Sequence, residues 1–400
     1  MRTTRKNNVL NLSLTFALIL ALLASLSLLP GCGNSTGTTS DQTTTNTSTA
    51  TNESDASATN NTQSVDPMAD RNITDVGGRK VTIPGTGALK SIYYTGATAE
   101  IFCFTLAPEL AGGTTYEWTE PELELLPKQM STLKYLGTQS GGKQLNLEAI
   151  MAEDIQLIFS CPVAAPTEKD ISDCDDLQNQ TGIPVVLLDG SLENVANTYR
   201  LLGEILGREA DANKLALYCE NKLAAVNSAI SAIPENERIK LYYAEGPDGL
   251  QTEPETSSHA YTYKLAGANN VATVEAKQGM GMSNVSLEQV IAWDPEVIIA
   301  WSFNVRGGAD ELIRTDPNWS EIKAVRDGRV YTMPNVPFSW CDRPPAVNRF
   351  LGIQWIANLL YPKYYDVDML ETVKEFYALF YHVEISDAKA KELLGNSYTK

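Results

Sequence analysis

Residues 147–159 read LEAIMAEDIQLIF, and residues 287–299, which lie 140 positions further along, read LEQVIAWDPEVII. In each copy, apolar residues at helical spacing are followed by a charged turn and then by a run rich in β-branched residues. Such a run suits a parallel strand that is covered on both faces. Helix–turn–strand units resemble one another in any α/β protein. Here, however, Glu148 aligns with Glu288 and Asp154 with Asp294, and this shared phase favours an internal duplication and a chain of two related lobes.

The rest of the chain alternates between strand and helix patterns in the same way. A hairpin that turns at Gly77–Gly78 is expected to open the ordered region. The longest helical run covers residues 192–233, and within it residues 210–232 continue without a break until Pro234, which suggests a rigid connector. Strands are expected at residues 91–94, 157–160, 185–188, 239–244, 297–301 and 330–333, and further helices from about residue 97 and at 262–265, 286–292 and 347–360.

The first 70 residues have a different composition. Arg2, Arg5 and Lys6 precede a charge-free run, residues 9–29, that ends in Pro-Gly-Cys. This is the layout of a secretory signal, and it resembles the bacterial lipoprotein box, in which Cys32 would be lipidated. An uncleaved transmembrane anchor is the alternative, and either version tethers the protein outside the membrane. The polar stretch that follows cannot bury enough apolar surface to fold and is expected to be a disordered tether.

These patterns predict six segments with different roles. We expect a signal peptide, a tether, a first α/β lobe, a connecting helical region, a second α/β lobe and a helical tail. Their expected bounds are 1–32, 33–70, 71–190, 191–234, 235–362 and 363–400.

Composition excludes several classes of function. The net charge of −18 argues against a nucleic-acid partner, because binding phosphates requires a basic face. Only two histidines occur and no CxxC motif, so no metal site or resident cofactor is expected. The absence of a Ser-His-Asp order and of a phosphate-cradling glycine loop argues against an enzyme. The sequence leaves the pairing of five further cysteines open, including a bridge between Cys161 and Cys174, and favours buried thiols for Cys103 and Cys219.

Ligands of open α/β sheets lie beyond the carboxyl ends of the strands, and these ends can be located in the sequence. The loop 335–345 is the most informative, because it combines aromatic side chains with an arginine just before a predicted helix. Aromatic faces bury apolar ligand surface, and a guanidinium donates in a fork to an anion. Alternatively, Trp340 caps the core of the lobe and Arg343 pairs with Asp342. The predicted ligand-binding residues are Tyr94, Thr95, Trp118, Phe303, Trp340 and Arg343.

Three motifs carry a family resemblance. They are TD followed by GRKV and IP within residues 74–84, LAGANNV at 265–271, and Trp319 followed by AVRDGRVY at 324–331. In this order they resemble the solute-binding proteins of ABC importers for iron-siderophores, haem and cobalamin. The resemblance covers roughly residues 72–361. It implies two Rossmann-like α/β lobes joined by one long helix, with the ligand bound in a cleft between them and little closure.

The resemblance also implies partners and a location. Glu148 and Glu288 match the family's pair of glutamates that dock on arginines of the permease. The ligand would be a metal chelate, namely a ferric-siderophore, haem or cobalamin, and the alternative is an oxyanion such as molybdate or tungstate. We therefore expect a monomeric, extracytoplasmic protein that is lipid-anchored to the bacterial cell membrane. A surface-anchored enzyme and a structural adhesin are the competing classes of function.

Overall fold

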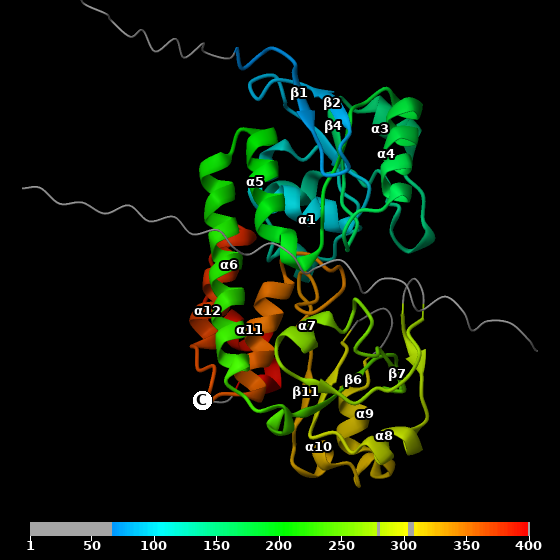
Figure 1. Cartoon of the computed structure of the whole chain (residues 1–400), viewed down its shortest axis with the longest axis vertical. Coiled ribbons are helices and arrows are strands. Elements are labelled where there is room, and N and C mark those ends of the chain that lie inside the picture. Colours follow the sequence, from blue (N-terminus) through cyan, green and yellow to red (C-terminus); the bar gives the residue numbers. More distant parts are fainter. Residues whose placement is uncertain (1–65, 278–280, 303–307, 399–400) are drawn as a thin grey trace, which may run out of the picture. The chain divides into compact units, whose positions relative to one another are not determined.

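The structure, a computed structural model, describes residues 66–277, 281–302 and 308–398 of the chain (Figure 1). An antiparallel hairpin of β1 (Arg71–Thr74) and β2 (Lys80–Ile83) comes first. Gly78 takes a positive φ of 75° in its turn, which glycine adopts without steric cost. The Asp75 carboxylate accepts hydrogen bonds from the backbone N–H groups of Gly77 and Arg79. The predicted hairpin is therefore confirmed.

The first lobe is built on a three-stranded parallel sheet in the order β3-β4-β5. Its strands are β3 (Ile92–Tyr94), β4 (Leu157–Ser160) and β5 (Val185–Leu187), and every strand residue except Ser160 is buried. Helices cover it on both sides, so the apolar runs are enclosed as predicted (Figure 1). These helices are α1 (Ala97–Leu106), α3 (Leu147–Ala152), α4 (Glu168–Thr181) and α5 (Val195–Leu206).

The second lobe is built on a parallel sheet in the order β11-β10-β6-β8. Along β6 the side chains alternate between two cores, as the period of two along a strand requires. Leu241 and Tyr243 pack into the larger core, and Tyr242 and Ala244 pack into a second one. The strands are β6 (Lys240–Ala244), β8 (Asn269–Asn270), β10 (Val297–Ala300) and β11 (Val330–Thr332), and the helices that contribute to the second core are α8 (Leu287–Trp293), α9 (Asp310–Thr315) and α10 (Lys323–Arg326).

The duplicated unit of the sequence has the same structure in both lobes. Asn146 caps α3 by accepting a hydrogen bond from the Ala149 N–H at 3.0 Å. Ser286 caps α8 by accepting one from the Gln289 N–H at 3.3 Å. Each helix leads into a strand with one neighbour on either side, β4 in the first sheet and β10 in the second. The predicted helix–turn–strand repeat is confirmed.

The helical run 192–233 is not continuous, which corrects one expectation. Gly207, with a φ of 67°, ends α5, and the chain folds back into α6 (Glu209–Ser231). The two helices pack together, and Arg200 Nη1 lies 2.7 Å from Glu220 Oε1. The unbroken stretch predicted at 210–232 is confirmed as α6, which also packs on α11 (Arg349–Leu360).

The C-terminal tail packs on this helical layer. It contains α12 (Met369–Phe380) and α13 (Asp387–Leu394). Phe376 and Phe380 of α12 make edge contacts with the Tyr218 ring of α6. One continuous hydrophobic core includes residues of both sheets, of α6, α11 and α12.

All five cysteines after Cys32 are buried free thiols. The bridge left open between Cys161 and Cys174 is not formed, and the expectation of buried thiols at Cys103 and Cys219 is confirmed. The signal segment and Cys32 lie outside the described residues. Within the part of the chain that the structure describes, no helix has the length and apolarity needed to cross a membrane.

Candidate ligand site

The carboxyl end of the first sheet presents Tyr94 and Thr95, as predicted. Tyr94 is fully buried, and its hydroxyl has no hydrogen-bond partner among the described residues. Thr95 joins the ends of β3 and β4, because its hydroxyl donates to Ser160 Oγ at 3.2 Å. These two residues lie at the sheet edge where a ligand is expected, and their contact with a ligand stays a prediction.

Helix α1 begins directly after Tyr94 and Thr95 in the chain. Its N-cap is Gly96, which has no side chain to satisfy the first N–H groups of the helix. The N–H groups of Ala97 and Thr98 find no acceptor in the described part of the chain. Thr98 Oγ1 donates to the Pro345 carbonyl at 3.4 Å, so this helix end lies against the loop 335–345 of the second lobe. Free amides at a helix N-terminus favour a negatively charged group.

An aromatic cluster joins the two lobes beside this point. Trp118 stacks on Tyr116 with ring centroids 4.3 Å apart, and both rings contact Phe338 of the second lobe at 5.7 and 5.5 Å. The Trp118 Nε1–H has no acceptor among the residues described. Trp118 therefore lies where the lobes meet, and its predicted role in ligand binding stays a prediction.

Glu100, which was not among the predicted site residues, holds the segment before these rings. Its carboxylate accepts hydrogen bonds from Thr114 Oγ1 and from the Thr115 N–H, both at 2.7 Å, and a third from the Thr115 hydroxyl. Burial raises the pKa of Glu100 to about 7, while the hydrogen bonds act in the other direction. The signal that could have been used is an acidic residue on an otherwise apolar helix.

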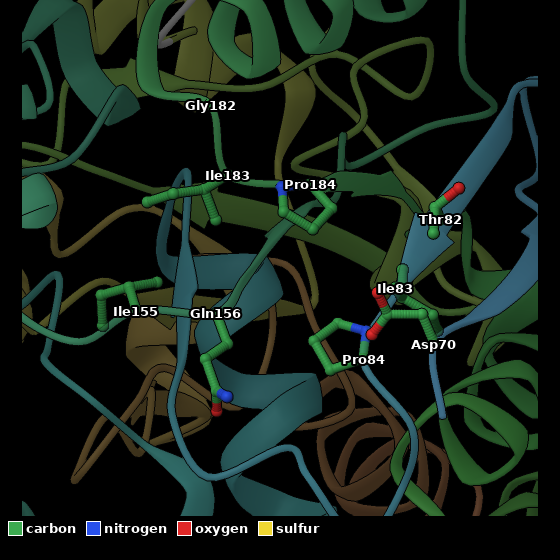
Figure 2. Close-up of a pocket in the computed structure, with 9 residues that line it drawn as sticks. All are labelled: Asp70, Thr82, Ile83, Pro84, Ile155, Gln156, Gly182, Ile183 and Pro184. Atoms are coloured by element: carbon green, nitrogen blue, oxygen red, sulfur yellow. The ribbon is translucent and has the colours of Figure 1, made fainter. Parts of the chain in front are cut away.

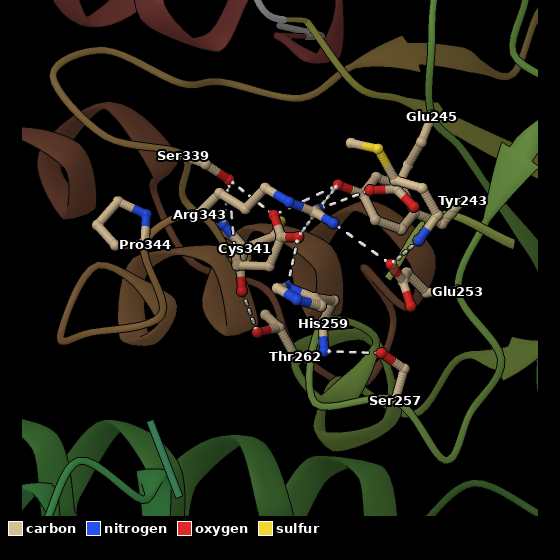
Figure 3. Close-up of polar contacts among 12 residues, drawn as sticks. Tyr243, Glu245, Glu253, Ser257, His259, Thr262, Ser339, Cys341, Arg343 and Pro344 are labelled. Carbon is tan, nitrogen blue, oxygen red and sulfur yellow. Dashed lines mark hydrogen bonds and ion pairs between the residues drawn. The ribbon is translucent and has the colours of Figure 1, made fainter. Parts of the chain in front are cut away.

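Arg343 lies within a group of buried acidic side chains (Figure 3). Its Nη1 is 2.6 Å from Glu245 Oε1 and also contacts Asp342, while Nη2 is 3.3 Å from Glu253 Oε1. The guanidinium carbon also lies 5.5 Å from the centre of the Trp301 ring. Burial alone would lower the pKa of Arg343, but the surrounding carboxylates raise it above its ordinary value.

The carboxylates of this group outnumber the arginine. Burial raises the pKa of Glu245, Arg343 acts against this, and Asp342 and Glu253 repel the charge of the carboxylate. His259 Nδ1 lies 3.3 Å from Asp342 Oδ2. The pairing of Arg343 with Asp342, which the sequence left as an alternative, is thus present. A ligand contact of Arg343 stays a prediction, and it would have to compete with three carboxylates.

Trp340 is part of the core in this structure. Its indole is fully buried, makes an edge contact with Trp355, and donates to the Tyr377 hydroxyl at 3.3 Å. Gly352 allows this packing, because a Cβ there would lie 2.0 Å from the Trp340 carbonyl oxygen. The capping role that the sequence left as an alternative accounts for these contacts. Phe303 lies outside the described residues.

Arg349, the first residue of α11, was not singled out in the sequence. Only 2% of its surface is exposed. Its Nη2 donates to the Gly190 carbonyl at 3.1 Å and its Nε to the Ala346 carbonyl at 3.4 Å. Burial lowers the pKa of Arg349 to about 10, although Glu193 acts against this. A useful sequence signal would have been an arginine soon after Pro344–Pro345, at the start of a strongly apolar helix.

The comparisons with known proteins now decide the family. Residues 168–337 match the family described as periplasmic binding protein. An ABC transporter solute binding protein from Sulfurospirillum deleyianum is 31% identical, with a TM-score of 0.73 over 81% of this chain and 98% of that one. The chain belongs to the family of ABC transporter solute-binding proteins. Members of this family bind substrates for transport and are not enzymes, and their location is extracytoplasmic.

Two curated relatives of this solute-binding protein are named for different ligands. The molybdate-binding protein MolA of Haemophilus influenzae is 27% identical over 80% of this chain and 93% of its own length. A vitamin B12-binding protein of Vibrio parahaemolyticus is 23% identical over 56% of this chain and 74% of its own length. The expected family resemblance and the two-lobed α/β fold are confirmed, and the comparisons leave the ligand open.

Two cavities of this solute-binding protein lie away from the strand ends. One of about 390 Å³ lies beside the hairpin, at the amino ends of β4 and β5 (Figure 2). Its lining includes Gln156 and Pro184, which precede these strands, and none of the predicted ligand-binding residues. A second of about 320 Å³ lies between α11, the loop that leads into α12, and residues 394–398 near the C-terminus. No group of three or more His, Cys, Asp or Glu side chains suited to a metal ion occurs among the described residues.

Glu148 and Glu288 occupy equivalent places in the two lobes. Each lies in the first turn of its helix, α3 or α8, and each is exposed. Neither forms an ion pair with a cation in the described part of the chain. Backbone and Ser286 hydrogen bonds lower the pKa of Glu288. Both side chains are therefore accessible to a partner, and docking on a permease stays a prediction.

Proposed function

We propose that this protein captures a compact oxyanion of the molybdate type outside the cytoplasm and delivers it to the permease of an ABC importer. The observation that carries the choice of ligand is the direct contact between the strand-end loops of the two lobes. Phe338 packs on Tyr116 and Trp118, and Thr98 Oγ1 bonds to the Pro345 carbonyl. These contacts leave a small ligand better accommodated than a large chelate.

Charge supports the same choice. The unused N–H groups of Ala97 and Thr98 provide donors for an anion at the carboxyl end of the first sheet. MolA, named for molybdate, aligns over 93% of its length, whereas the vitamin B12-binding protein aligns over 74%.

A metal chelate is the second candidate. The aromatic cluster of Tyr116, Trp118 and Phe338 favours it, because stacked rings bury apolar ligand surface. This reading requires the lobes to separate at the cluster and expose these rings to the ligand.

A binding panel tests the proposed function. Thermal melts with molybdate, tungstate, sulfate, ferric citrate, haem and cobalamin should show stabilisation by molybdate or tungstate. A ligand present at 100 times its dissociation constant adds about 2.7 kcal/mol to the free energy of unfolding. Stabilisation by haem or cobalamin with no response to any oxyanion would overturn the proposal in favour of the chelate.

The remaining expectations complete the proposed function. The protein acts as a monomer, Glu148 and Glu288 dock on the permease, and Cys32 carries the lipid that holds the protein at the membrane. Exposed charge pairs contribute about 0.2–1 kcal/mol each, so such docking would set orientation more than affinity. Cys32→Ser should release the protein from the membrane fraction. Retention of this variant would mean that the apolar run at 9–29 is an uncleaved anchor.

A further inference from the structure

Arg349 differs from Arg343, the half-buried arginine of this region, in having no acidic partner among the described residues. No carboxylate oxygen of a described residue lies within 4.0 Å of its nitrogens. Glu193 is the acidic group that acts on it most strongly. However, Glu193 is exposed and already accepts a hydrogen bond from the Tyr261 hydroxyl. The charge of Asp342 also raises the pKa of Arg349, but Asp342 forms its ion pair with Arg343.

The donors of Arg349 are only partly used. A guanidinium has five N–H donors. Among the described residues, Arg349 donates through Nε and Nη2 to two backbone carbonyls, and Nη1 has no acceptor. Burying a cation is costly unless it is paired and hydrogen-bonded. An anionic ligand would supply both the missing charge and the missing acceptors.

Packing brings Arg349 to the strand ends of the first lobe. Its Nη2 reaches the Gly190 carbonyl, just beyond β5. Gly190 is required there, because a Cβ would lie 2.3 Å from the Pro162 carbonyl oxygen in the loop after β4. Arg349 also contacts Ala346, whose neighbour Pro345 accepts a hydrogen bond from Thr98 of α1. The side chain and the free amides of α1 thus approach the same turn from two lobes.

The backbone of α11 itself offers no comparable donors. The N–H groups of Arg349, Phe350 and Leu351 donate to the carbonyls of the preceding turn, at 3.2, 2.9 and 3.1 Å. These three N–H groups are therefore already used, and the donor of α11 that remains for an anion is the Arg349 side chain.

We propose that Arg349 is the residue of the second lobe that binds the ligand, donating through its guanidinium to an oxyanion that the N-terminus of α1 contacts from the first lobe. This inference rests on the proposed function and deepens it, because it names the side chain that would pair with the negative charge of the ligand. It also makes the ligand a bridge between the lobes, which the permease could sense.

Arg349→Met and Arg349→Lys test the inference by calorimetry with molybdate and tungstate. Losing a hydrogen bond to a charged group corresponds to a drop in affinity of about ten- to a hundredfold, which is expected for Arg349→Met. Arg349→Lys should recover only part of this, because an ammonium cannot reproduce the guanidinium fork. Arg200→Met is the matched control, since it removes an exposed arginine paired with Glu220, and should bind as wild type does.

The outcomes separate the inference from the proposed function. If the wild-type protein binds no oxyanion, the proposed function fails. If it binds molybdate or tungstate and a folded Arg349→Met variant binds equally well, the proposed function stands and Arg349 is only a structural link to Gly190. Should Arg349→Met not fold, Arg349→Lys decides the matter, because unchanged affinity in that variant overturns recognition by a guanidinium.

Discussion

Arg343 and Arg349 lie on either side of the turn at Pro344–Pro345, and their surroundings are opposite. Arg343 meets three carboxylates, which hold its pKa above the ordinary value. Arg349 is bonded to carbonyls alone, and burial lowers its pKa to about 10. One charge is compensated inside the protein, and the other has no acidic partner among the described residues. This difference is the reason for proposing Arg349, and not Arg343, as the contact of an anionic ligand.

The largest expected effect is on stability. Arg343→Met should lower the free energy of unfolding by about 3–5 kcal/mol, because it leaves three buried carboxylates without their cation. Arg349→Met should cost at most about 2 kcal/mol, since it removes two hydrogen bonds and also the cost of burying a charge. Urea denaturation of both ligand-free variants measures the difference. Equal losses would mean that Arg349 is as strongly involved in the fold as Arg343 is, and would remove the basis of the comparison.

A smaller effect is expected on how stability depends on pH, because several acidic side chains surround Arg343. Burial raises the pKa of Glu245 from 4.5 to about 8, with Asp342 and Glu253 repelling its charge and Arg343 attracting it. The folded protein therefore binds more protons at this site than the unfolded chain does between these pH values, and its contribution to stability falls as the pH rises. The steepest slope for one group is about 1.4 kcal/mol per pH unit.

Glu245→Gln tests this effect, because the amide cannot titrate. The stability difference between this variant and the wild type, measured by denaturation from pH 5 to pH 8, should shift in favour of the variant as the pH rises. A constant difference across this range would show that Glu245 titrates alike in the folded and unfolded chains. In that case the acids around Arg343 would be fully compensated.

The smallest effect on the folded protein is expected at Glu148 and Glu288. Like Arg349, they have no ionic partner within the described residues, but they are exposed, so losing them should change stability by less than about 0.5 kcal/mol. The double variant Glu148→Ala with Glu288→Ala should keep the affinity for the ligand and lose uptake in cells that carry the transporter. A marked loss of affinity instead would place these residues in the ligand site and refute a role in docking.

The fold could be predicted in outline because its signals are local. The β-branched apolar runs of the strands, the helical spacing and the shared phase of residues 147–159 and 287–299 are present in short stretches of chain. These signals correctly indicated both central strands and the long helix α6. The same local reasoning missed the end of α5, because Gly207 takes a positive φ that an apolar helical pattern does not show.

The tertiary structure alone decided the partners of the charged residues. From the sequence, Arg343 was predicted to bind the ligand, with pairing to Asp342 as the alternative, and Arg349 fell within the helix expected at 347–360. Arg343 instead meets Glu245 and Glu253, about ninety to a hundred residues away, and Arg349 meets Gly190, 159 residues away. Spacing along the chain carries no information on such contacts, and the cost of a buried charge depends on them. The sequence determined that two α/β lobes form, while packing determined which arginine lacks an acidic partner among the described residues.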